Sequence, residues 1–265
     1  MSKIKKRKEA IATLNKLMGS PENVLAIHYS CESFYDKTDG KSPRITSIAV
    51  RYLKSAQTTS FSIHQIGERE NFNLAQIENK YDELERKMLE EFFDFVRTHS
   101  GYKWLHWNMR DINYGFHALE HRFKVLGGQP VVINDEQKFD LARILIDMYS
   151  VSYAPHPRLP KLIEMNKIAP KDFLSGADEA IAFTNKDYVK LHQSTLRKVD
   201  VINNIAQRAY EGTLKTSSKL KEIYGVSPQG IYELIKDHWF FGLLATILVT
   251  IAGILMQNAF SGNPK

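Results

Sequence analysis

The sequence contains only one cysteine, Cys31, among 265 residues. A single thiol excludes an intrachain disulfide framework and any zinc or iron–sulfur site built from several cysteines, and it favours a reducing compartment. The chain also lacks internal repeats and low-complexity tracts. With 43% hydrophobic and 25% charged residues it has the composition of a folded globular protein of one large or two small domains. A mean hydropathy of −0.34 excludes a polytopic membrane protein.

Charge is absent from one long segment near the C-terminus. Positions 239–260 contain no Asp, Glu, Lys or Arg, and about 20 such residues cross the hydrocarbon core of a bilayer. We therefore predict a transmembrane helix at 239–260, preceded by a linker and juxtamembrane helix at 212–238 and followed by a short tail at 261–265. A buried hydrophobic helix is the alternative. Small residues in the segment also allow a homo-oligomer formed through this helix.

Basic residues are unevenly distributed around this segment and give the chain a formal net charge of +6. Lys215, Lys219, Lys221 and Lys236 precede it, whereas only Lys265 follows, so the positive-inside rule predicts a single-pass protein with its N-terminal part in the cytoplasm. In a prokaryote this would be the inner membrane.

The first 19 residues combine a dense basic run with apolar residues at helical spacing. This pattern predicts an amphipathic helix and not a secretory signal, because no uninterrupted apolar stretch follows the charges. Two interpretations stay open at this stage. The helix is either a basic arm that contacts phosphate or lipid headgroups, or a solvated first helix packed on the domain that follows.

Residues 20–211 predict an α/β domain with a mixed sheet. Three segments with strand character, 24–30, 45–53 and 59–66, suggest an antiparallel meander. Alternating helices and strands then follow. We predict helices at 82–99, 112–126 and 139–149 with strands at 103–107 and 131–133 between them, then a short helix at 159–166 and a long one at 186–210.

Three local segments carry a resemblance to a known family. VLAIHYSCES contains the first predicted strand, LHWNMRDINYGFHALEHRF begins at the end of the fourth, and VKLHQSTLRKVDVI lies in the long helix predicted at 186–210. Together with the order of elements, they resemble the three motifs of the ribonuclease H-like DEDD 3′–5′ exonucleases, the superfamily of DnaQ-type proofreading domains. The resemblance covers roughly residues 20–205 and implies a ribonuclease H-like fold.

The resemblance also implies where catalysis would occur, and there the sequence departs from the family. Family members hold two divalent metals about 4 Å apart on four carboxylates. The corresponding positions here are His28 and Ser30 in the first motif, Asn113 in the second and Arg197 in the third, and only His192 retains the family's residue. Arg197 would be repelled by metals. We therefore expect no metal, and a neutral-to-basic pocket in which His28, Asn113, His192 and Arg197 bind a ligand.

A small shift in alignment gives a second, acidic set that would support catalysis. It comprises Glu32, Asp36, Asp111, Asp187 and Asp200, together with His192. These acids are otherwise solvated or cap helices, as Asp111 would do directly before a helix.

We therefore expect a membrane-anchored, non-catalytic nuclease-like sensor or effector. It would bind a nucleic acid, a nucleotide or a protein partner in the cytoplasm and act through its membrane helix, for example in bacterial antiviral defence or toxicity. No cofactor is expected in that case. The alternatives are a tail-anchored 3′–5′ exonuclease that uses Mg²⁺ or Mn²⁺ and a tail-anchored protein-binding adaptor.

Overall fold

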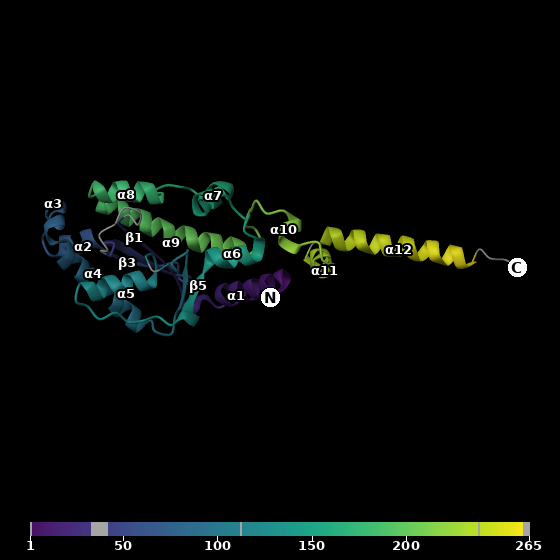
Figure 1. Ribbon diagram of the computed structural model, residues 1–265, viewed down its shortest axis with the longest axis horizontal. Coiled ribbons are helices and arrows are strands. Elements are labelled where there is room, and N and C mark those ends of the chain that lie inside the picture. The colour runs from purple at the N-terminus through teal and green to yellow at the C-terminus, as the bar shows by residue number, and fades with distance from the viewer. Residues whose placement is uncertain (1, 33–41, 112, 238, 262–265) are drawn as a thin grey trace.

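The computed structural model describes residues 2–32, 42–111, 113–237 and 239–261. A folded body holds the sheet and most of the helices, and one long helix projects from one end of it (Figure 1).

A five-stranded mixed sheet forms the centre of the body, in the order β3-β2-β1-β4-β5. The first three strands pair antiparallel, whereas β4 pairs parallel to β1 and β5 pairs parallel to β4. The strands are β1 (Val24–Cys31), β2 (Ile45–Tyr52), β3 (Thr58–Ser62), β4 (Lys103–His106) and β5 (Lys138–Asp140).

Both faces of the sheet are covered by helices, so β1 is buried along its whole length. Because side chains alternate along a strand, Leu25, Ile27 and Tyr29 enter one core, against α4 and α5. Val24 and Ala26 enter the other core, against α1, α6 and α9. The helices are α1 (Lys3–Met18), α2 (Ile63–Arg69), α3 (Leu74–Ile77), α4 (Tyr81–Thr98), α5 (Phe116–Val125), α6 (Leu141–Tyr149), α7 (Arg158–Met165), α8 (Gly176–Thr184), α9 (Tyr188–Tyr210), α10 (Leu220–Tyr224), α11 (Pro228–Asp237) and α12 (Trp239–Ser261).

The α/β class and the mixed sheet with flanking helices are confirmed, and two predicted strands need correction. The strand predicted at 59–66 ends at Ser62, and α2 begins at Ile63, because Ile63 and Ile66 lie on one helical face that packs into the core. Residues 131–133 are not a strand. The strand that pairs with β4 lies at Lys138–Asp140.

The amphipathic helix predicted at the N-terminus is present as α1, and its apolar face is part of the body. Leu14, Leu17 and Met18 pack in the core that α6 and α9 share, whereas the lysines of the first two turns are exposed.

Among the described residues, no single helix is long and apolar enough to cross a membrane. Pro228–Asp237 and Gly242–Gln257 satisfy the criteria of length and hydropathy only as a pair, which is bent by 110°. The span predicted at 239–260 therefore stays a prediction.

Candidate functional site

A cavity of about 530 Å³ lies at the carboxyl end of β1, beside the residue that follows β4. From β1 the chain continues to β2 on one side, and from β4 it continues towards β5 on the other. Such a switch point, at the carboxyl ends of parallel strands, is where open α/β sheets bind ligands. Its walls come from β1, from the residue after β4, from the start of α7, and from α8 and α9; they include His28, Tyr29, Cys31, Trp107, Tyr114, Leu159, Phe173, Glu179 and Lys198.

A buried ion pair forms the polar part of this cavity. Lys198 of α9 is only 5% exposed, and its Nζ lies 2.7 Å from a carboxylate oxygen of Glu179 on α8. The Ser194 hydroxyl donates to the same carboxylate at 2.9 Å. Buried charges are tolerated when they are paired and hydrogen-bonded in this way, so the pair leaves the site close to electrically neutral.

His28 adds an uncharged ring beside this pair. Burial, and then the positive charge of Lys198, hold the pKa of His28 well below its usual value, so the imidazole is neutral at physiological pH. The Tyr114 hydroxyl lies 3.2 Å from Nδ1 of His28 and donates to the Tyr29 carbonyl at 3.1 Å. His28 is thereby held by a tyrosine, and its ring can exchange hydrogen bonds with a ligand.

Cys31 completes this part of the wall without supplying a nucleophile. It is buried and carries a free thiol. Burial raises the pKa of that thiol well above its usual value, so the reactive thiolate is disfavoured.

Of the four residues predicted to bind a ligand and the motif residue Ser30, His28 is the only one that lines this cavity. Ser30 is buried further along β1, where its Oγ has no hydrogen-bond partner among the described residues. Asn113 is exposed in the loop before α5, and its backbone N–H donates to the Asp111 side chain at 2.8 Å.

His192 and Arg197 lie outside the lining of this cavity and contact other residues. The His192 ring hydrogen-bonds Ser60 of β3 at 2.9 Å and lies 5.0 Å from the His64 ring. Burial lowers the pKa of His192 to about 4, so this ring is also neutral at physiological pH. Arg197 forms an ion pair with Asp200 and donates to the Ala169 carbonyl. The structure therefore does not bring the predicted set to one point.

The alternative acidic set is also dispersed. Glu32 pairs with Arg44 at 3.3 Å, and Asp200 pairs with Arg197 and lies 3.6 Å from Arg51. Asp111 and Asp187 are exposed, and Asp36 lies outside the described residues. Within the part of the chain that the structure describes, no three of His, Cys, Asp and Glu gather in a way that could hold a metal ion.

Lys198 was not predicted as a site residue, although the spacing of apolar residues in α9 places it on the buried face. Leu191, Thr195, Lys198, Ile202 and Ile205 recur at three- and four-residue spacing and are all buried, so they share the inner face of α9. Arg197, one residue earlier, is rotated about 100° around the helix axis. Glu179 was missed because α8 was not predicted, although Ser175 and Asp178 form the capping box that begins this helix.

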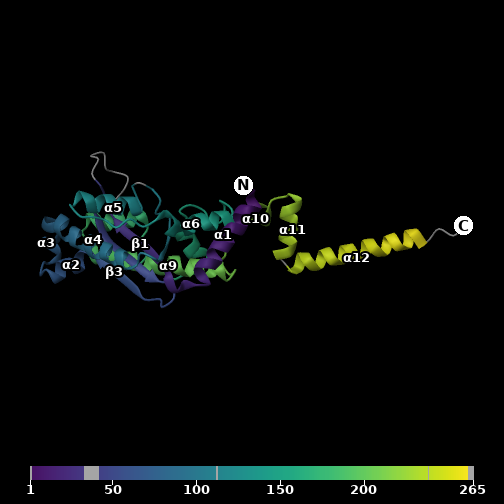
Figure 2. The same ribbon diagram turned by 90° about the horizontal axis from the view of Figure 1, so that it is seen from below.

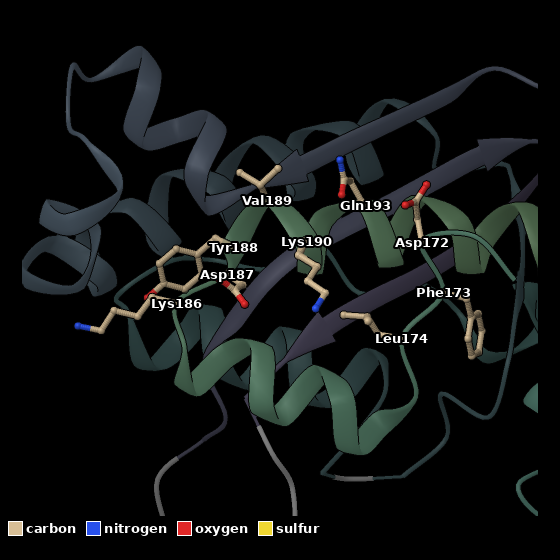
Figure 3. Close-up of a pocket in the computed structure, with 9 residues that line it drawn as sticks. All are labelled: Asp172, Phe173, Leu174, Lys186, Asp187, Tyr188, Val189, Lys190 and Gln193. Atoms are coloured by element: carbon tan, nitrogen blue, oxygen red, sulfur yellow. The ribbon is translucent and has the colours of Figure 1, made fainter.

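A second hollow, of about 610 Å³, lies at the start of α9. Figure 3 shows that its lysines do not converge, since Lys186 extends away from the other labelled side chains. The Tyr188 hydroxyl is engaged with Glu78 at 2.9 Å, and Lys186, Asp187 and Lys190 are exposed. The charged side chains of this hollow are thus solvated, and the hydroxyl of its buried tyrosine is already hydrogen-bonded.

Comparisons of the chain with protein-family models, with curated proteins and with solved structures find no match.

Proposed function

We propose that this chain is a membrane-attached, non-catalytic nuclease-like protein. Its body binds a ligand in the cavity beside β1, and α12 attaches it to a bilayer. The observation that carries this proposal is the Lys198–Glu179 ion pair, which is buried in that cavity.

The sheet supports the relationship to ribonuclease H-like nucleases. An antiparallel meander continues through a helical connection into a strand parallel to β1, as that resemblance implies. The long helix α9 packs against β1 and β2, so the first and third motif segments lie against each other.

The chemistry of the cavity supports binding without hydrolysis. Two-metal hydrolysis needs several carboxylates directed at one point. Here Glu179, the one carboxylate among the described residues that line the cavity, is already neutralised by Lys198. An ammonium group at this point would repel a divalent cation, as Coulomb's law requires at low dielectric.

The walls indicate the class of ligand. Trp107, Tyr114 and Phe173 supply aromatic surface, and the polar groups are a neutral histidine and a neutralised ion pair. A flat, uncharged, heteroaromatic group suits such walls because it stacks on rings and exchanges hydrogen bonds with His28. The nucleobase of a nucleotide or of a single strand has this chemistry.

Ligand binding and hydrolysis are tested with the full chain in detergent. We expect a labelled single-stranded RNA or a mononucleotide to bind and to stay intact with Mg²⁺ or Mn²⁺. Trp107→Ala should weaken binding about 5- to 150-fold, the value of one base–aromatic stack. Tyr232→Ala, which alters an aromatic residue that is 64% exposed and outside the cavity, is the matched control.

Fluorescence anisotropy and gel analysis of the same samples give both readouts. Cleavage that depends on the metal would establish the exonuclease alternative. Equal affinity of the wild-type chain and the Trp107→Ala variant would place the ligand outside this cavity. No binding to either probe, together with a protein that co-purifies in high salt, would favour the adaptor alternative.

The exposed apolar surface of α12 supports attachment to a membrane. The described side chains from Leu248 to Met256 include Val249 at 73%, Leu255 at 63% and Met256 at 64% exposure, so the described parts of the chain leave this stretch of the helix uncovered. An apolar helix left uncovered in water is an aggregation hazard, whereas a bilayer would bury it.

We expect the full chain to stay in the membrane pellet after alkaline carbonate extraction. Leu248→Arg with Ile251→Arg should release most of it, since two arginines near the centre of a span cost about 5–7 kcal/mol. The control is Val132→Arg with Ile181→Arg, which adds the same charges at exposed apolar positions of the body. Extraction of the wild-type chain, or equal extraction of both variants, would contradict attachment through α12.

A further inference from the structure

The first turns of α1 meet α11 at the end of the body from which α12 leaves. Arg7 pairs with Asp237 at 2.9 Å, and its guanidinium lies 4.7 Å from the ring centre of Tyr224. Lys8 pairs with Glu233, which is 5% exposed, at 2.6 Å. Figures 1 and 2 both show the N-terminus of α1 beside α10 and α11. Two segments more than 200 positions apart in sequence thus form one surface.

This end of the molecule carries most of the net positive charge of the chain, which is +6 in all. Residues 2–9 and 212–238 together contain nine Lys and Arg against four Asp and Glu, and two of those acids are the partners of Arg7 and Lys8. Lys3, Lys5 and Lys6 are exposed and form no ion pair within the described residues. Lys219, Lys221 and Lys236 are exposed as well. We call these six lysines the junction surface.

Apolar side chains accompany the cations. Val226 is 84% exposed, and Ile231 and Tyr232 of α11 are 49% and 64% exposed. Lysines beside exposed aliphatic and tyrosyl side chains are typical of segments that lie at the level of lipid headgroups. The bend of 110° between α11 and α12 allows α11 to lie along a bilayer surface while α12 enters it.

We infer that the junction surface contacts the headgroups of an anionic bilayer. This inference rests on the proposed attachment through α12. Attachment turns the end of the body that carries the junction lysines toward the bilayer, and anionic lipid attracts cations that lie within a Debye length of the headgroups, about 8 Å at physiological salt. The connection to α12 and the exposed aliphatic side chains of Val226 and Ile231 favour a lipid surface over a nucleic acid.

The test separates insertion from headgroup binding by using the Leu248→Arg, Ile251→Arg chain, in which α12 no longer inserts. Flotation is measured with vesicles of phosphatidylcholine alone or with about 30 mol % phosphatidylglycerol, an anionic lipid content that gives a substantial negative surface potential. We expect this chain to float only with the anionic vesicles and to be released by about 0.5 M salt, which screens the attraction. Adding Lys3→Gln, Lys5→Gln and Lys6→Gln should lower its partition coefficient about 100-fold, about fivefold for each lysine.

The matched control neutralises three exposed lysines on α5 and near the start of α9: Lys124→Gln, Lys186→Gln and Lys190→Gln. We expect this control to change partition only slightly, and circular dichroism verifies that each variant is folded. Equal effects of the two triple variants, or equal flotation with neutral and anionic vesicles, would overturn the inference. So would a loss of single-stranded RNA binding in the Lys3, Lys5, Lys6 variant with vesicle binding unchanged, which would identify a nucleic-acid surface.

These outcomes are distinct from failure of the proposed attachment. If carbonate extracts the wild-type chain, α12 does not hold it in the bilayer, whatever the headgroup charge. If carbonate does not extract it and the three lysines have no effect on partition, attachment stands and the inference about anionic headgroups is wrong.

Discussion

Replacing Lys198 with methionine is expected to lower the free energy of unfolding by about 3–5 kcal/mol, because the change leaves the Glu179 carboxylate buried without its partner. The side chains of this pair are only 7% and 12% exposed, so water can compensate little. Glu179→Gln should have a similar effect, since it leaves the Lys198 ammonium unpaired. Denaturant unfolding of the full chain in detergent, followed by the near-ultraviolet signal, measures both.

The double variant Lys198→Met, Glu179→Gln distinguishes an ion pair from two independent contacts. It removes both charges, and the carboxamide oxygen introduced by Glu179→Gln can still accept from the Ser194 hydroxyl, which donates to the carboxylate in the wild-type chain. We expect it to recover at least half of the stability that either single variant loses. Losses that simply add would show that the two charges do not stabilise each other.

A second large loss is expected for Arg122→Met, again about 3–5 kcal/mol at neutral pH. Arg122 donates to both carboxylate oxygens of Glu85, at 3.0 and 2.6 Å. Glu85 is fully buried and also accepts from the backbone N–H of Ile45 at 2.6 Å, so it links α4 to the start of β2. Without Arg122, the Glu85 carboxylate would be buried between α4 and β2 without a partner of opposite charge.

The loss should depend on pH in a defined direction. Burial raises the pKa of Glu85 despite its pairing with Arg122, and removal of the arginine raises this pKa further. A carboxyl whose folded pKa exceeds its unfolded value destabilises the fold increasingly as pH rises through the folded pKa. The deficit of the variant should therefore be largest at pH values above the raised pKa of Glu85, and it should shrink as the pH falls and Glu85 takes up a proton.

Arg86→Met provides the control, because Arg86 is an exposed arginine of the same helix. Its effect should stay within about 0.5 kcal/mol at every pH. A deficit of Arg122→Met that does not change between about pH 5 and pH 8 would show that packing of the arginine stem, and not the charge of Glu85, is what the variant loses.

Burial imposes a periodic pattern of apolar residues on the sequence, and this pattern predicted much of the fold. The alternation in β1, with Leu25, Ile27 and Tyr29 opposite Ala26 and His28, and the apolar face of α4 follow directly from the sheet and helix that they form. Short elements contain too few residues to show such a periodic pattern. β5 is only three residues long and is defined by its pairing with β4, while the β-branched residues 131–133 resemble a strand locally and lie outside the sheet.

The candidate site was less predictable because its members come from distant segments. His28 was predicted from the first motif, but its neighbours depend on which face of α9 is buried and on a helix, α8, that was not predicted. A shift of one residue, from Arg197 to Lys198, exchanges a residue outside the cavity for one inside it. Pairing of Lys198 with Glu179 depends on how α8 packs against α9, and no local pattern contains this information.

The length of α9, which runs from Tyr188 to Tyr210, lets one element join two distant parts of the body. The same helix that contributes Lys198 to the cavity packs Ile205 and Ala209 into the core beside α1. Lys198 and Ala209 are roughly 17 Å apart along the axis at about 1.5 Å per residue. One continuous helix therefore borders both the cavity and the core that contains α1. Arg7 and Lys8 in turn join α1 to α11, which precedes α12.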